Sequence, residues 1–142
     1  MPRDRIFTSP QFRETMDNLK EADVLGLSLV ENKDAFMLAT ALGLSDPSPM
    51  QKRVGLFLNT ALKTVDKALI ASVLMGTVAE ESQIDDFADL DKSSDLCEQC
   101  AERGYQVLLK KYNDSGCDKE VFERMLLKEL EFLYTKNVAD NL

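Results

Sequence analysis

The 142-residue sequence contains no histidine and no tryptophan. Without histidine, the chain cannot form a Ser-His-Asp or Cys-His catalytic arrangement, an HExxH zinc site, or any site that uses an imidazole base near neutral pH. Catalysis by carboxylates or by lysine is still compatible with the composition, although no motif indicates it. The missing histidine therefore excludes more classes of enzyme than any other feature of the sequence.

Residues that interrupt helices are also scarce, with only four prolines and six glycines. The remaining composition is rich in Leu, Ala, Lys and Glu, which favour helices. A chain of this length forms one ordinary domain and buries about two thirds of its unfolded surface, so it needs no metal or disulfide to fold. We expect residues 1–142 to form a single all-α or mainly α domain, a compact bundle of about five helices with at most one short two-stranded ribbon.

The hydrophobic spacing predicts where these elements lie. We expect helices over residues 10–21, 32–44, 59–81, 94–112 and 119–134. Ser9 is a suitable N-cap for the first helix, and Pro10 suits its first position, where a missing N–H group costs nothing. Apolar residues alternate over 25–29, which predicts a short strand, and the only other strand candidate is 53–58. These two segments would form the ribbon.

The longest apolar run covers residues 68–79 and is too short to span a bilayer, which requires about 20 residues. It continues a helical stripe whose members are Leu62, Val65, Leu69 and Val73. Past residue 68 the helix is apolar on nearly all sides, which is typical of a helix at the centre of a bundle or in a dimer interface. The sequence is compatible with both a monomer and a homodimer, and we expect no membrane contact.

The formal net charge is −8, so phosphate backbones repel most of the surface. This excludes generic nucleic-acid binding by the whole protein but leaves a local basic patch open. Three cysteines form no disulfide framework, which suits a reducing compartment. The first residues, MPRDRIFTSPQF, contain arginines without an apolar core, unlike a signal peptide. We expect a cytoplasmic protein without a cofactor.

Cys97 and Cys100 form a CxxC motif inside the helix predicted over 94–112. On that helix the apolar face carries Cys97, Cys100, Ala101, Gly104, Tyr105, Leu108 and Tyr112, and the opposite face carries Glu98, Glu102, Arg103, Gln106 and Lys110. A structural zinc ion needs four ligands, and the only further cysteine is Cys117. A redox CxxC is typically preceded by a strand. We therefore favour core packing of both thiols over a metal or redox role.

Gly104 lies in the middle of the same predicted helix, where glycine costs about 1 kcal/mol relative to alanine. We expect it to allow a neighbouring helix to approach closely. The segment 80–95 is acidic and contains Asp85, Asp86, Asp89, Asp91 and Asp95. Because it lacks the central glycine of a calcium-binding loop, a solvated loop or short helix is favoured over a cation site.

Three short stretches together resemble a known family: RDRIF, NKDAFMLATALGL and CAERGYQVL. They are similar to the DNA phosphorothioation-associated protein 4 family, also called dnd system-associated protein 4. The matching positions are Lys33, Asp34, Phe36, Ala39, Ala41, Leu42 and Gly43 in the middle stretch, and Ala101, Gly104 and Tyr105 in the later one. Cys100 stands where the family has an aromatic residue, and Arg103 replaces a glycine.

The resemblance implies a role in bacterial antiviral defence. Members of the family are encoded beside the machinery that replaces a DNA phosphate oxygen with sulfur, or beside the restriction apparatus that depends on that mark. The resemblance supplies no catalytic residues. Our first hypothesis is therefore a non-enzymatic accessory protein, or adaptor, that acts by docking on a larger protein of such a DNA modification or restriction complex.

Basic residues are the candidate contacts for such a partner, or for a weak direct contact with DNA phosphates. They are Arg3, Arg5, Lys52, Arg53, Lys63 and Lys67. On an acidic protein they could form one local patch. The alternative is that they are scattered, solvated surface charges.

Two further hypotheses follow from the acidic residues. An acidic inhibitor or DNA mimic, such as a phage counter-defence protein, would present carboxylates along one face at phosphate-like intervals, whereas an ordinary surface scatters them. A small enzyme could bind magnesium through Asp85, Asp86 and Asp89, or react through Cys97. The enzyme ranks last because no phosphate-cradling glycine loop is present.

Overall fold

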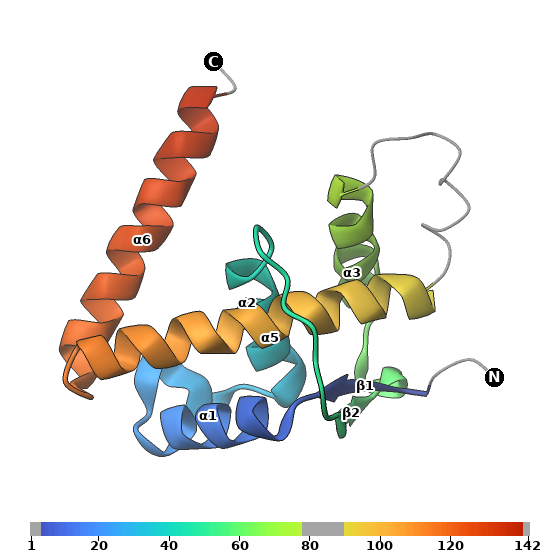
Figure 1. Cartoon of the computed structure of the whole chain (residues 1–142), viewed down its shortest axis with the longest axis horizontal. Coiled ribbons are helices and arrows are strands. Elements are labelled where there is room, and N and C mark those ends of the chain that lie inside the picture. Colours follow the sequence, from blue (N-terminus) through green and yellow to red (C-terminus); the bar gives the residue numbers. More distant parts are fainter. Residues whose placement is uncertain (1–3, 78–89, 141–142) are drawn as a thin grey trace.

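The computed structural model describes residues 4–77 and 90–140, and these are mainly α-helical (Figure 1). The elements in order are β1 (Arg5–Thr8), α1 (Pro10–Glu21), the 3-10 helix η1 (Val24–Leu29), α2 (Asn32–Leu42), β2 (Val54–Leu58), the 3-10 turn η2 (Asn59–Ala61), α3 (Thr64–Thr77), α5 (Leu90–Asp114) and α6 (Lys119–Asp140). A mainly α fold with a short ribbon confirms the class predicted from the sequence.

The two-stranded ribbon is present, but one of its predicted strands is wrong. β2 pairs antiparallel with β1, so that Arg5 lies opposite Leu58. Residues 24–29 form η1 instead of a strand. The backbone at Leu25 and Gly26 has φ values of 56° and 68°, in the left-handed region that no extended strand adopts. The alternation of apolar residues in this segment therefore comes from a tight turn that buries some of its side chains.

Helix α1 has the bounds and the cap that the sequence predicts. The Ser9 hydroxyl oxygen accepts a hydrogen bond from the Phe12 backbone N–H at 3.1 Å, and Pro10 occupies the first turn. Its side chains Phe12, Met16 and Leu19 are buried in the core. Helix α2 also begins at the predicted residue, Asn32, and its N-cap is the preceding Glu31.

Helix α5 is the central element, and α1, α2, α3, α6 and β1 all contact it (Figure 1). The predicted apolar face of this helix is confirmed. The side chains of Cys97, Cys100, Ala101, Tyr105 and Leu108 are buried. Packing in the core is thus the structural role of both cysteines of the CxxC motif.

Helices α2 and α5 touch backbone to backbone at two glycines. A Cβ atom on Gly104 would lie 1.8 Å from the Ala39 carbonyl oxygen, and one on Gly43 would lie 1.8 Å from the Cys100 carbonyl oxygen. This confirms the close approach expected at Gly104. Gly43 is the C-cap of α2, and its φ of −105° is not left-handed. The close helix contact, and not a special turn, is what requires glycine there.

Helix α3 begins five residues later than predicted, since residues 59–61 form η2 and Leu62 is extended. The Lys63 backbone N–H donates to the Asp66 carboxylate at 2.8 Å at the start of the helix. The predicted apolar stripe is wrong at Val65 and Leu69, which are 69% and 48% exposed. The side chains of 72–79 lie outside the described residues, so the monomer and homodimer alternatives stay predictions.

Helix α6 follows a loop in which Gly116 has a φ of 71° and the Asp118 carboxylate accepts from the Val121 N–H at 3.1 Å. Its first turns are anchored to the body: Phe122 is fully buried, and its ring lies 5.5 Å from that of Tyr112. Beyond these turns α6 projects away from the other helices (Figure 1). No helix among the described residues has both the length and the apolarity required to cross a bilayer.

Replacing Gly104 with alanine is expected to destabilise the fold by about 2 kcal/mol or more, because the added methyl group must push α2 away from α5. Urea unfolding followed by circular dichroism measures the change. Gly55→Ala is the matched control: its Cβ would meet only the flexible Arg5 side chain, at 3.2 Å, so we expect a change within ~0.5 kcal/mol. Equal stability of Gly104→Ala and the parent protein would contradict the close contact.

Candidate functional site

The loop between α2 and β2 crosses over α5 and covers one polar side of it (Figure 1). The Ser48 N–H donates to the Gln99 carbonyl oxygen at 2.9 Å, and Arg103 Nε donates to the Asp46 carbonyl oxygen at 3.0 Å. These bonds attach the loop to the helix at two points. Together with β1 and the start of α1, the loop encloses two glutamates that the helical pattern assigns to the polar face of α5.

Glu98 is the first of these, and it is only 1% exposed. One carboxylate oxygen accepts from the Phe7 backbone N–H at 2.7 Å, and the other pairs with the Arg53 guanidinium at 2.7 Å. That guanidinium also lies over the Phe7 ring, 4.9 Å from its centre. Glu98 therefore fastens α5 to the ribbon, and both of its oxygens have a partner.

Glu102 lies one turn further along α5 and is 8% exposed. Burial raises the pKa of its carboxyl group, while hydrogen bonds from the Ser9 and Tyr105 hydroxyl groups act in the opposite direction. Its Oε2 atom is buried and has no hydrogen-bond partner among the described residues. Glu98 and Glu102 thus share burial but differ in how well their oxygens are satisfied.

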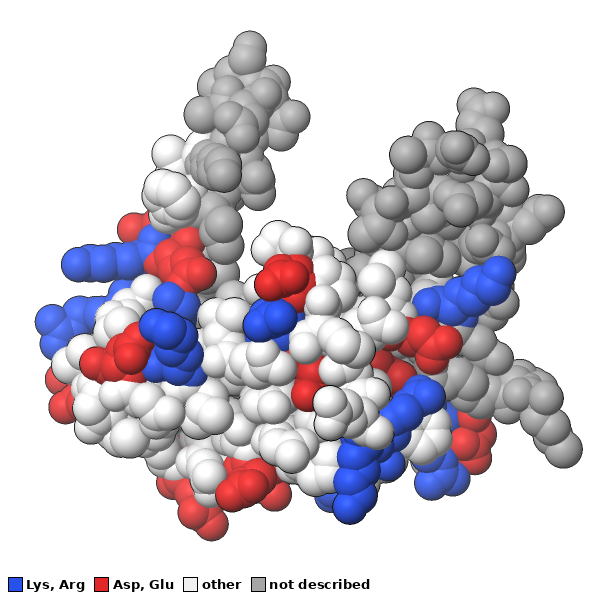
Figure 2. All heavy atoms as spheres, viewed as in Figure 1, with Lys and Arg blue, Asp and Glu red and all other residues white. Residues whose placement is uncertain are grey.

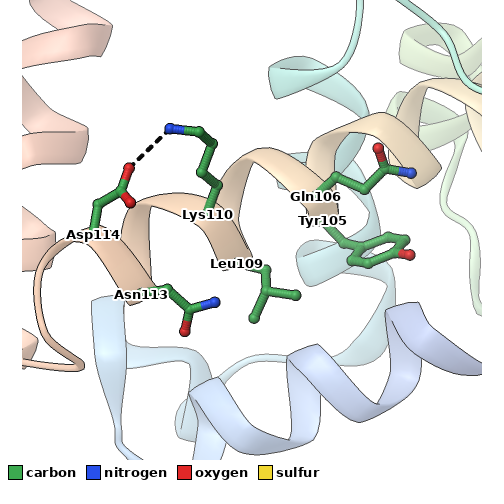
Figure 3. Close-up of a pocket in the computed structure, with 6 residues that line it drawn as sticks. All are labelled: Tyr105, Gln106, Leu109, Lys110, Asn113 and Asp114. Carbon is green, nitrogen blue, oxygen red and sulfur yellow. Dashed lines mark hydrogen bonds and ion pairs between the residues drawn. The ribbon is translucent and has the colours of Figure 1, made fainter.

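Glu102 lines a hollow of about 460 Å³ between α5, the start of α1 and the crossing loop. The lining residues are Ser9, Gln11, Ser48, Pro49, Gln51, Lys52, Glu102, Tyr105 and Gln106. A second depression of about 390 Å³ adjoins it and is lined by α5 alone: Tyr105, Gln106, Leu109, Lys110, Asn113 and Asp114 (Figure 3). Because Tyr105 and Gln106 belong to both, we treat the two as one surface, the α5 groove.

The side chains of the outer half of the groove point in two directions (Figure 3). Leu109 and Asn113 point toward α1. Lys110 and Asp114 point to the other side of the helix and form an ion pair at 2.9 Å. The groove therefore combines a partly exposed apolar side chain, side-chain amides and a buried carboxyl group.

The two cysteines of the CxxC motif do not contribute a reactive group. Burial, together with Cys100 and Glu98 nearby, raises the pKa of the Cys97 thiol to about 12, and burial also raises that of Cys100. Both thiols stay protonated at neutral pH, and neither is a nucleophile in this state. Cys117 is exposed in the loop before α6. Within residues 4–77 and 90–140, no group of three or more acidic or cysteine side chains gathers as metal ligands would.

The predicted acidic ligands Asp85, Asp86 and Asp89 lie outside the described residues. At the edge of that segment, Asp95 lies 3.7 Å from the Arg53 guanidinium.

The structure places five of the six predicted basic contacts, in two regions. Arg3 lies outside the described residues. Arg5 lies in β1 and pairs with Asp4 at 2.9 Å. Arg53 directly precedes β2 and pairs with Glu98, and Lys52, the residue before it, lines the hollow. Lys63 and Lys67 are exposed one turn apart at the start of α3. Their action as one contact surface stays a prediction.

Charges of both signs alternate on the face of the protein that Figure 2 shows. Lys and Arg side chains gather toward the ribbon and toward the turn between α5 and α6, and Asp and Glu side chains lie among them in both places. A DNA mimic requires carboxylates in ordered rows, without positive charges among them. The described part of this face has no such arrangement.

Comparison with protein-family models, with curated proteins and with solved structures gives no match for this chain. The resemblance to phosphorothioation-associated proteins therefore stays an expectation from the sequence.

The helical pattern did not predict that Glu98 and Glu102 are buried, although one feature of it places both glutamates close to the buried face. Positions 98, 102, 105 and 109 form a row along α5, so the two glutamates flank the apolar stripe beside Tyr105. Only the crossing loop, which is remote in sequence, turns this flank into an enclosed site.

Glu98→Gln is expected to destabilise the protein by about 2 kcal/mol, since the amide cannot serve both the Phe7 N–H and the Arg53 guanidinium. Chemical denaturation at neutral pH measures this. Asp95→Asn is the control: it removes a half-exposed carboxylate facing the same arginine, and we expect an effect within ~0.5 kcal/mol. A larger effect at Asp95 than at Glu98 would show that the buried ion pair has been assigned to the wrong residue.

The pKa of Glu102 makes a prediction about pH. The pKa of Glu102 is raised in the folded state, so as the pH rises above 4.5 this carboxyl group ionises in the unfolded chain before it ionises in the folded protein. The folded protein therefore loses stability as the pH rises from the unfolded pKa to the folded pKa. Glu102→Gln has no charge to bury. We expect the stability of this variant, relative to the parent protein, to increase from pH 4 to pH 7. Urea titrations at both pH values measure this, and a relative decrease would contradict the burial of the carboxyl group.

Proposed function

We propose that this protein is a non-enzymatic adaptor that docks on a larger protein of a bacterial DNA modification or restriction system of the phosphorothioation type. The kind of system comes from the sequence resemblance. The observation that supports a docking role is the exposed apolar surface of α6.

Helix α6 projects from the body of the protein (Figure 1). Several of its large apolar side chains are exposed to solvent. Leu127, Leu130 and Phe132 are 59%, 41% and 66% exposed. Scattered exposed apolar residues are normal, but three within six residues of a projecting helix are typical of an interaction surface. Burying them against a larger protein would contribute about 25 cal/mol per Å² of apolar surface removed from water.

Two features support an adaptor over the competing functions. The interspersed charges in Figure 2 differ from the single-sign rows of a DNA mimic. The protonated, buried thiols of Cys97 and Cys100 supply no nucleophile. The exposed side of α6 and the α5 groove are instead surfaces on which another protein can bind.

The test is affinity purification of the tagged chain from its native host, with mass spectrometry of the proteins that co-purify. We expect subunits of a DNA modification or restriction complex. Recovery of a nuclease in inhibited form would favour the mimic. Recovery of no partner, together with a tight homodimer of the purified chain, would overturn the adaptor proposal.

A variant with Leu127→Glu and Leu130→Glu locates the contact. Both side chains lie outside the core, so the fold is expected to persist while at least ten times less partner co-purifies, as loss of ~1.4 kcal/mol or more of binding energy implies. Val65→Glu, on the exposed side of α3, is the control and is expected to retain the partner. Full recovery with the α6 variant would exclude α6 as the docking surface.

A further inference from the structure

The two buried glutamates of α5 differ in one respect that bears on binding. Glu98 receives a cation from its own chain, the Arg53 guanidinium at 2.7 Å. Glu102 receives none among the described residues, and its Oε2 atom has no hydrogen-bond partner. A buried polar atom without a partner costs about 1–3 kcal/mol, so a donor brought by another molecule would remove a penalty that the free protein carries.

The α5 groove around Glu102 is rich in side-chain amides. Gln11 and Gln51 lie at the inner hollow, Gln106 lies where the two depressions meet, and Asn113 lies in the outer one. An amide side chain both donates and accepts hydrogen bonds, as does a peptide backbone. Leu109, 37% exposed, adds an apolar contact two turns beyond Glu102 along the helix, past Tyr105. This lining suits an extended peptide better than a compact charged ligand.

We propose that the α5 groove binds an extended peptide segment of a partner protein and that an arginine or lysine of this segment pairs with Glu102. This inference rests on the proposed adaptor function for the source of the peptide. It adds the chemistry of the segment: a basic residue and, two positions later on the same side of the extended peptide, an apolar residue that extends toward Leu109. A guanidinium presents two parallel N–H donors and can serve both oxygens of a carboxylate.

The carboxyl group can present its unpartnered oxygen to such a ligand. Oε2 is covered in the free protein, but the last torsion of a glutamate side chain is broad, so rotation about it turns this oxygen toward the hollow that Glu102 lines. Pairing with a cation favours the ionised carboxylate and offsets the effect of its burial.

Lys52 allows an experiment to distinguish a basic peptide ligand from an acidic one. It lines the same hollow and forms no ion pair within the described ranges. A basic peptide is repelled by Lys52 and attracted by Glu102, whereas an acidic peptide has the reverse preference. Neutralising each residue in turn therefore identifies the sign of the ligand.

The experiment is a titration of the isotope-labelled full chain with the blocked pentapeptide Gly-Arg-Gly-Leu-Gly, followed by amide chemical shifts in nuclear magnetic resonance spectra. Matched peptides carry glutamine or glutamate in place of arginine. We expect the arginine peptide to shift the amides of Glu102, Gln106 and Asn113. Glu102→Gln should weaken its binding about tenfold or more, as expected for loss of a charge-assisted hydrogen bond. Lys52→Gln should leave binding unchanged or strengthen it.

Controls keep the outcomes distinct. Glu21→Gln removes an exposed carboxylate at the far end of α1 and should bind the arginine peptide like the parent protein. The spectrum of each variant reports whether it is folded. Preferred binding of the glutamate peptide with loss in Lys52→Gln would overturn the proposal, as would equal binding of all three peptides or the absence of shifts in the groove.

The same variants separate this proposal from the adaptor function. If Glu102→Gln still co-purifies the partner in full, the adaptor proposal stands and the groove proposal fails. If the arginine peptide binds at the groove but no modification or restriction subunit co-purifies, the groove proposal stands and the assignment to that system fails.

Discussion

The contact between the backbones of α2 and α5 is the constraint on which the rest of the structure depends. Gly43 and Gly104 lie on opposite sides of this contact, and neither has room for a methyl group. The Thr40 hydroxyl group adds to it by donating to the Phe36 carbonyl oxygen at 2.8 Å, within 3.4 Å of the Cys97 carbonyl oxygen. Small residues at this crossing let α5 lie at the centre, where the other helices can cover its apolar face.

The crossing also determines where the chain must go next. Because α2 ends against the backbone of α5, the loop that follows has to pass over α5 to reach the ribbon. Its backbone groups bond to the polar side of the helix at Gln99 and Arg103. Burial of Glu98 and Glu102 is a consequence of this path. Glu98 forms a buried ion pair with Arg53, whereas Glu102 lines a hollow and has one oxygen without a hydrogen-bond partner among the described residues.

The two surfaces proposed for binding differ in their physical character. The α5 groove is polar, lies beside rigid and well-packed elements, and is suited to a short segment with a defined charge. The outer part of α6 is apolar, projects from the body, and is suited to a larger contact area driven by removal of apolar surface from water. Their anchor is shared, since Tyr112 at the end of α5 packs on Phe122 at the base of α6. For a partner that engages both surfaces, the charge in the α5 groove would select the bound segment, and the apolar area buried on α6 would supply binding energy.

The sequence by itself determined the local features of this protein: the class of fold, the Ser9 and Asp118 caps, the left-handed Gly116 and the apolar face of α5. These depend on a residue and its neighbours within a few turns. Tertiary structure alone decided which strand pairs with β2, which side of α3 is exposed at Val65, and that Glu98 and Glu102 are enclosed. In each of these cases the deciding contact joins segments far apart in the chain, and helical periodicity carries no information about what will cover a given face.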